Sequence, residues 1–167
     1  MIHARRPEIP AVLREREDAW GQEYEEKRAA SPGHRFQWKT LEGKPVNQHL
    51  LPQLQRMTAH HCAYCDGFPL GPFARETIDH FRPKSRFPRD AYRWQNLFLA
   101  CDVCQDAKGE SFDAAVLKPD VDDYAFDRYF LFNVRTGEIE PNPAGTTQDE
   151  QERARKTIEW LGLNSHT

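Results

Sequence analysis

The four cysteines of the chain form two pairs with the same spacing, Cys62-Ala63-Tyr64-Cys65 and Cys101-Asp102-Val103-Cys104. Two thiolates in this spacing on a tight turn can reach one metal ion, and two such pairs supply the four sulfur ligands that zinc takes in structural sites. Disulfides or buried free thiols are the alternative, but disulfides are rare in chains that are not exported. The sequence therefore predicts a closed, structural zinc site at Cys62, Cys65, Cys101 and Cys104.

The segment between the two cysteine pairs carries residues that could hydrolyse a phosphodiester. Such a reaction needs a base that takes a proton from water, a cation at the departing oxygen and positive groups on the phosphate. His80 can serve as the base. Side chains that are adjacent on a strand point to opposite faces, so Asp79 and His80 can share a site only where the strand ends or bends. Pro83 favours such an end.

The stretch from Phe81 to Trp94 is electropositive, with a local charge of +4 in a chain whose net charge is −3. Nucleic acid would therefore have to bind through a local patch. Aromatic residues interleave with the cations, which suits a phosphate backbone with some base stacking, although we expect Trp94 itself to lie in the core. The predicted nucleic-acid contacts are Arg82, Lys84, Arg86 and Lys108, the last of which could instead carry charge at a helix end.

Residues 102–127 have the opposite character, with a local charge of −6. This face should repel DNA. It could dock a basic partner, although a solvated acidic loop is the commoner explanation.

Length and composition place limits on the whole chain. A chain of 167 residues predicts one compact domain. Because 38% of its residues are apolar, its core should be thin, and a bound metal ion would stabilise it. No apolar run is long enough to cross a membrane, and the amino terminus lacks the apolar stretch of a signal peptide. We therefore expect a cytoplasmic protein without a membrane partner.

Hydrophobic spacing predicts the elements that must position these residues. We expect a long helix from Glu8 to Ala30, and a second from about Asn47 to Thr58 with Pro52 in its first turn. Two short strands should follow, one around Thr77-Ile78 and one over 96–100, and then a short helix that ends at Gly109.

The carboxyl-terminal part predicts a hairpin and a last helix. The strands should be 129–134 and 138–140, with their aromatic residues covering the core. Thr147 and Glu150 form a capping box for a helix that Gly162 is placed to end. We expect an α+β protein made of a helical flank (1–58), a central unit (59–112) and a segment (113–167) that packs on it as one domain.

Taken together, the central motifs closely resemble the HNH endonucleases. The resemblance rests on Thr77-Ile78-Asp79-His80-Phe81-Arg82-Pro83-Lys84, Trp94-Gln95-Asn96-Leu97 and Cys101-x-x-Cys104-Gln105-x-x-Lys108-Gly109. It implies a ββα-metal finger that the four-cysteine zinc site stabilises. It also implies that Asp79 ligates a divalent cation, Mg²⁺ or Mn²⁺, and that Asn96 braces the loop that orients His80.

One signature position departs from the family pattern. Gln105 stands where the family usually has Asn or His. Its amide oxygen can still ligate magnesium, but the side chain is one methylene longer and must pack differently. Asp102 or Asp106 could take its place, so the resemblance gives Asp79 and Gln105 as the catalytic cation site with these alternatives open.

The flanks are similar to one HNH branch, the short nuclease subunits of Septu-type and retron-associated antiphage systems. The shared features include Met1-Ile2 through Pro10-x-x-Leu13, Phe130-x-Phe132, Gly137-x-Ile139-x-Pro141 and Thr157-Ile158-x-x-Leu161-x-Leu163-Asn164. This similarity implies a partner subunit, an ABC-type ATPase, and a role in degrading invading or host DNA.

Three functions are therefore considered. The first is a metal-dependent HNH endonuclease that cleaves DNA, with His80, Asp79, Asn96 and Gln105 as its catalytic residues. The second is a zinc-stabilised nucleic-acid-binding module without catalysis. The third is an interaction subunit that regulates an ATPase. The residues leave open whether the substrate is DNA or RNA and whether the chain forms a homo-oligomer.

Overall fold

The computed structural model describes residues 1, 3–72, 74–144 and 147–165 as a mixed α and β protein. Ile2, part of the flanking pattern, lies outside these ranges. The helices are α1 (Ala11–Arg14), α2 (Glu17–Ala30), α3 (Val46–Met57), α4 (Asp102–Lys108), α5 (Phe126–Tyr129) and α6 (Gln148–Leu161). The strands are β1 (Thr40–Leu41), β2 (Lys44–Pro45), β3 (Glu76–His80), β4 (Leu97–Cys101), β5 (Phe130–Asn133) and β6 (Glu138–Pro141).

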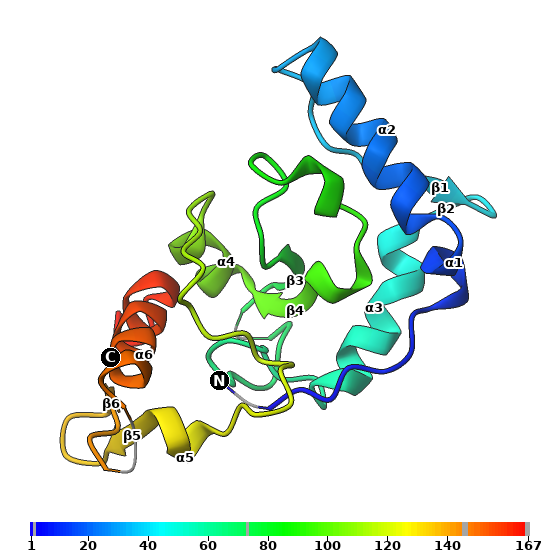
Figure 1. Ribbon diagram of the computed structural model, residues 1–167. Coiled ribbons are helices and arrows are strands. Elements are labelled where there is room, and N and C mark those ends of the chain that lie inside the picture. Colours follow the sequence, from blue (N-terminus) through cyan, green and yellow to red (C-terminus); the bar gives the residue numbers. More distant parts are fainter. Residues whose placement is uncertain (2, 73, 145–146, 166–167) are drawn as a thin grey trace.

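Within the described ranges the strands pair in sequence order into three antiparallel two-stranded sheets, β1–β2, β3–β4 and β5–β6. Figure 1 shows the β3–β4 pair in the middle of the molecule, with α2 and the β1–β2 pair towards one end and α6 with β5 and β6 towards the other. Of the helices in the described ranges, none has the length and apolar composition that crossing a bilayer requires.

Strand β4 is buried along its whole length and joins the two main apolar clusters. Leu97 and Leu99 pack with Leu50 and Leu54 of α3, whereas Phe98 and the alternating positions on the other face pack towards the cysteines and α6. Because side chains alternate along a strand, one short strand can serve two clusters. The core is thus built around the segment that carries the second cysteine pair.

The central hairpin and helix confirm the sequence prediction. Strands β3 and β4 pair from Glu76 opposite Cys101 to His80 opposite Leu97. Helix α4 begins at the residue after β4 and ends before Gly109, which has a φ of +53°. The long loop between His80 and Leu97, which we name the central loop, contains two 3₁₀ turns, Pro88–Asp90 and Trp94–Asn96.

The predicted long helix over Glu8 to Ala30 is wrong as a single element. It is broken between α1 and α2, where Arg16 has φ −123° and ψ −25°. Leu13 of α1 is buried against α3, whereas α2 packs against the 3₁₀ turn Pro88–Asp90. One straight helix cannot serve both contacts, so the chain bends between them.

Two other local expectations are also corrected. Pro52 lies inside α3 and not in its first turn, because α3 already begins at Val46. Pro52 removes one helical hydrogen bond, but it lies on the exposed side of α3, where water can replace the bond. In the β5–β6 hairpin Phe130 is buried as expected, whereas Phe132 is 57% exposed and does not cover the core.

The last helix follows its prediction closely. Thr147 and Glu150 make both reciprocal bonds of a capping box at the start of α6. Gly162 ends the helix in the left-handed conformation, with φ +58° and ψ +37°.

The amino-terminal segment ties distant parts of the chain together, a role that the sequence did not indicate. The Arg6 guanidinium pairs with Asp120 and donates to the carbonyls of Trp94, at 2.6 Å, and Leu97, at 3.1 Å. The Tyr124 hydroxyl donates to the Met1 carbonyl at 2.7 Å. The segment thus fastens the start of β4 to the acidic stretch after α4.

The contact between α2 and the central loop depends on Gly21. A Cβ at this position would lie 2.2 Å from the Arg89 carbonyl oxygen, which is too close for any carbon atom. We therefore predict that Gly21→Ala lowers the free energy of unfolding by about 1 kcal/mol. The overpacking cost of about 1–3 kcal/mol exceeds the gain of about 1 kcal/mol in helix propensity. Urea denaturation measures the difference.

Gly33→Ala is the matched control, because its Cβ would meet nothing within 4 Å. It should change the free energy of unfolding by less than about 0.5 kcal/mol. A Gly21→Ala protein more stable than the wild type would show that α2 does not pack on Arg89 as described.

Candidate functional site

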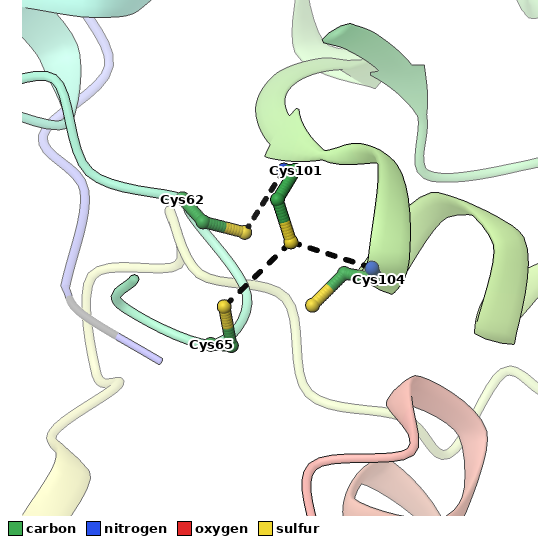
Figure 2. A group of neighbouring side chains, drawn as sticks. All are labelled: Cys62, Cys65, Cys101 and Cys104. Atoms are coloured by element: carbon green, nitrogen blue, oxygen red, sulfur yellow. Dashed lines mark hydrogen bonds between the residues drawn. The ribbon is translucent and has the colours of Figure 1, made fainter. Parts of the chain in front are cut away.

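The four cysteines lie together, as their spacing predicts. All four are free thiols, and their Sγ atoms lie within 4.8 Å of one another. Figure 2 shows the first pair coming from the turn before β3 and the second from the end of β4 and the start of α4. The backbone N–H groups of Cys101 and Cys104 donate to the Sγ atoms of Cys62, at 3.3 Å, and Cys101, at 3.4 Å.

This arrangement fits one tetrahedral ion. Zinc–sulfur bonds of about 2.3 Å place the sulfurs of a tetrahedral shell roughly 3.8 Å apart. The Cys65 and Cys101 Sγ atoms are 3.8 Å apart, and the Gly67 N–H donates to Cys65 Sγ as it would to a thiolate. These four residues can therefore hold a metal ion that joins the turn before β3 to β4 and α4.

The second group of polar residues lies where β3 ends. Asp79 is 3% exposed, and its Oδ2 accepts a hydrogen bond from the Tyr64 hydroxyl at 2.7 Å. The same oxygen lies 3.5 Å from Nζ of Lys108, which is equally buried and lies over the Trp160 ring. Burial raises the pKa of the Asp79 carboxyl, while the nearby Lys108 charge opposes that rise.

His80 points to the other face of β3, into an aromatic environment. Its ring stacks on Trp38, with centroids 5.7 Å apart, and meets the Phe36 ring edge-on at 5.3 Å. Nε2 lies 2.9 Å from the Ala91 carbonyl in the central loop. Burial lowers the pKa of His80 to about 3, and the charge of Lys84 adds to this effect. The ring is therefore neutral at pH 7, the form that a general base needs.

One pocket of about 350 Å³ brings the predicted residues together. Asp79, His80, Lys84 and Gln105 all line it. Asp79 and His80 point to opposite faces of β3, and one pocket borders both because it lies at the end of the strand, which is His80. The remaining lining residues include the alternative ligand Asp106, together with Lys108 and Glu110.

The other alternative ligand, Asp102, is occupied elsewhere. Its Oδ1 accepts from the backbone N–H groups of Arg75 and Val103, both at 3.1 Å. It therefore fastens the start of α4 to the chain before β3. Of the two alternatives to Gln105, the pocket thus retains Asp106 alone.

Asn96 joins the two ends of the central loop. Its Oδ1 accepts from the Arg82 N–H at 2.7 Å, and its Nδ2 donates to the carbonyls of Arg82 and Asp90, both at 3.0 Å. Asp90 precedes Ala91, whose carbonyl meets His80. The buried Asn96 amide thus holds the loop that contacts the histidine ring.

The four basic residues expected at nucleic acid fall into two pairs by their contacts. The Arg82 and Arg86 guanidinium groups lie over the same Phe87 ring, at 3.9 and 5.8 Å, and Lys84 and Lys108 line one pocket. Lys84 lines the pocket of Asp79 and His80, whereas Arg82 pairs with Asp90 at 2.7 Å and lines a different pocket with Arg93. The Arg86 guanidinium is exposed and lies near the Phe112 carbonyl. Lys108 lines the pocket of Asp79 and His80, but it is largely buried and its Nζ lies 3.5 Å from Asp79 Oδ2.

Sequence reasoning missed the residues that surround the two central side chains. Tyr64 lies inside the first cysteine pair and contacts Asp79, while Phe36 and Trp38 contact His80 from a segment that we assigned no function. The one available signal was the density of aromatic residues in His34-Arg35-Phe36-Gln37-Trp38. The loop aromatics Tyr92 and Trp94 are buried, as expected for Trp94.

The comparison with known protein families agrees with this geometry. Residues 62–111 match the family model described as HNH endonuclease. The match runs from the first cysteine pair through β3, the central loop, β4 and α4, and it supports a nuclease-like function for this part of the chain. Among curated proteins, none matches the chain.

The cysteine cluster generates a test of metal content. We predict one metal ion per chain in the wild type. Cys104→Ser should lose the ion and about 3 kcal/mol or more of unfolding free energy, because binding to a structural site contributes directly to folding. Elemental analysis and thermal melting measure the two effects. Val103→Ser changes an exposed neighbour in the same turn and should leave both unchanged. Retained metal in Cys104→Ser would contradict the four-sulfur shell.

Asn96 generates a second test. Asn96→Ala removes three hydrogen bonds of a buried amide, and we predict a loss of about 2–3 kcal/mol in unfolding free energy. Amide hydrogen exchange should also become faster at residues 90–92. Gln95→Ala removes an exposed amide next to it and serves as the control. Equal stability of the two variants would show that Asn96 does not brace the loop.

Proposed function

We propose that this protein is a metal-dependent endonuclease of the HNH type that hydrolyses DNA phosphodiester bonds. The observation that carries the proposal is the single pocket at the end of β3, which brings Asp79, His80 and Gln105 together within the HNH-matched residues. In this proposal His80 is the general base. The Ala91 carbonyl fixes its ring through Nε2, which leaves Nδ1 as the nitrogen that takes the proton from water.

The proposed cation site consists of hard oxygen donors. Asp79 offers a carboxylate and Gln105 an amide oxygen, which suit Mg²⁺ or Mn²⁺. Both contacts of the carboxylate, from Tyr64 and Lys108, fall on Oδ2, so Oδ1 is the oxygen to present to a cation. A bound cation would stabilise charge on the departing oxygen. Lys84 would hold the phosphate, and zinc would fill the cysteine shell as a structural ion.

The biological setting is a further part of the proposal. The similarity of the flanks to Septu-type and retron-associated nucleases supports a role in antiphage defence beside an ABC-type ATPase. The acidic segment 102–127 is a candidate docking face for a basic surface of that partner, although Asp120 is buried with Arg6 and Lys118.

Two observations favour a second candidate, a catalytically weak nucleic-acid-binding subunit. Lys108 already neutralises Asp79, and Gln105 stands at the position where Asn or His is usual. Either feature would weaken cation binding. The two candidates differ in whether any cleavage depends on His80.

Plasmid cleavage tests the proposal. The purified protein should nick supercoiled plasmid with Mg²⁺ or Mn²⁺ and should not nick it when divalent cations are omitted. His80→Ala should lower the rate at least about 100-fold, because a general base contributes roughly that factor or more. His60→Ala, which changes an exposed histidine, should cleave like the wild type.

Gln105→Asn separates the two explanations of an inactive protein. Activity that appears in this variant would assign the defect to the cation shell. Absence of cleavage by both the wild type and Gln105→Asn would favour the requirement for a partner subunit. Cleavage by His80→Ala at the wild-type rate would overturn the assignment of the base.

A further inference from the structure

A second pocket lies next to His80 and is not used in the proposed chemistry. Trp38 stacks on His80 and also lines this separate pocket, whose volume is about 280 Å³. The volume is close to the lower end of the range for small-molecule sites. We name it the aromatic pocket and define it by Trp20, Tyr24, Trp38, Tyr92, Lys27 and Lys39.

The aromatic walls come from three segments. Trp20 belongs to α2, Trp38 precedes β1, and Tyr92 belongs to the central loop. The Tyr92 ring meets Trp20 edge-on at 5.4 Å and Trp38 edge-on at 5.7 Å. Tyr92 is buried, whereas both tryptophans are half-buried and keep ring surface for a ligand. Flat aromatic surfaces of this kind stack nucleobases.

The charge of the aromatic pocket indicates which charge a flat ligand should carry. The Glu23 carboxylate is held between Lys27, at 2.6 Å, and Lys39, at 2.5 Å. The lining therefore carries two cations against one carboxylate. An aromatic cage for an ammonium ligand would need the opposite balance. A ligand that combines a flat ring with a phosphate fits both the walls and the charge.

The place of the aromatic pocket relates it to the cleavage site. One ring, Trp38, lies between its interior and His80. Lys84, which lines the pocket of Asp79 and His80, has its Nζ 5.7 Å from the Phe36 ring, and Phe36 in turn packs on Trp38. A strand with a phosphate at Lys84 would therefore have a neighbouring base close to Trp38.

We propose that the aromatic pocket binds one unpaired nucleobase of the substrate, with Lys27 and Lys39 on an adjacent phosphate. The inference rests on the proposed function in so far as the substrate is a nucleic acid. A base inside a duplex is stacked and paired, so it can enter only from a single strand or after flipping out. The substrate class is thus single-stranded or locally opened nucleic acid.

Oligonucleotide binding without added divalent cations tests the proposal separately from cleavage. Fluorescence anisotropy should show a single-stranded DNA or RNA oligonucleotide binding about tenfold tighter than a duplex of equal length. Comparing the DNA and RNA arms identifies the sugar that is preferred. Replacing one base with an abasic site at successive positions should weaken binding about tenfold at one position, the usual size of one stacking contact.

Variants then assign the effect to the pocket. Trp20→Ala should bind the intact strand about tenfold more weakly than the wild type does, and it should bind the abasic strand with the same affinity as the wild type. Trp20→Phe should recover most of the lost affinity. Phe132→Ala removes an exposed ring elsewhere and is the control. Lys27→Gln should weaken binding about threefold and more strongly than Lys44→Gln, which changes an exposed lysine outside the pocket.

The proposal is overturned if the wild type does not bind the single strand, binds duplex equally well, or is insensitive to every abasic position. It is also overturned if folded Trp20→Ala, checked by thermal melting, binds like the wild type. These outcomes are independent of the plasmid assay. Base-dependent binding without cleavage would support this inference whatever the plasmid assay then shows about the nuclease, and His80-dependent cleavage without base-dependent binding would remove this inference alone.

Discussion

Asp79 and His80 are neighbours in the chain but point to opposite faces of β3, because successive side chains alternate along a strand. Each face then needs its own surroundings. On one side Tyr64 and Lys108 contact Asp79, and Trp160 in turn contacts Lys108. On the other side Phe36, Trp38 and the loop carbonyl of Ala91 contact His80. The β3–β4 hairpin and α4 supply only part of these surroundings. The rest comes from the cysteine turn, from α6 and from the amino-terminal flank, so the chain beyond the HNH-matched residues builds the site as well.

The cysteine cluster and Asn96 each fix a segment of irregular backbone beside the short β3–β4 hairpin. The cluster holds the turn before β3 against the start of α4, and it thereby positions Tyr64, which lies between Cys62 and Cys65. Asn96 holds the loop after β3 through three hydrogen bonds. Both segments also bury aromatic side chains, Tyr64 in the cysteine turn and Tyr92 and Trp94 in the loop, so the polar contacts act together with apolar packing.

Local signals in the sequence predicted the elements whose causes are local. The spacing of the cysteines, the capping box of Thr147 and Glu150, and the glycines after α4 and α6 each act within a few residues, and the structure has them where expected. Among contacts between distant residues, the cysteine cluster had a signal in the sequence, the shared spacing of its two pairs, whereas other such contacts had none. Asp79 and Lys108 are far apart in sequence, and nothing in either neighbourhood indicates that a buried ion pair joins them. The break after α1 and the stacking of Trp38 on His80 depend in the same way on tertiary packing.

The Asp79–Lys108 pair limits how a divalent cation could bind in the pocket. Lys108 neutralises the one buried carboxylate there, and the amide of Gln105 adds no charge. A cation at Oδ1 of Asp79 would therefore meet little net attraction from these groups and some repulsion from the ammonium. Mg²⁺ commonly takes few protein ligands and completes its shell with water and substrate phosphate. The substrate phosphate would add its attraction to that of the exposed Asp106 and Glu110 carboxylates, which line the same pocket, so cation and nucleic acid should each favour the binding of the other.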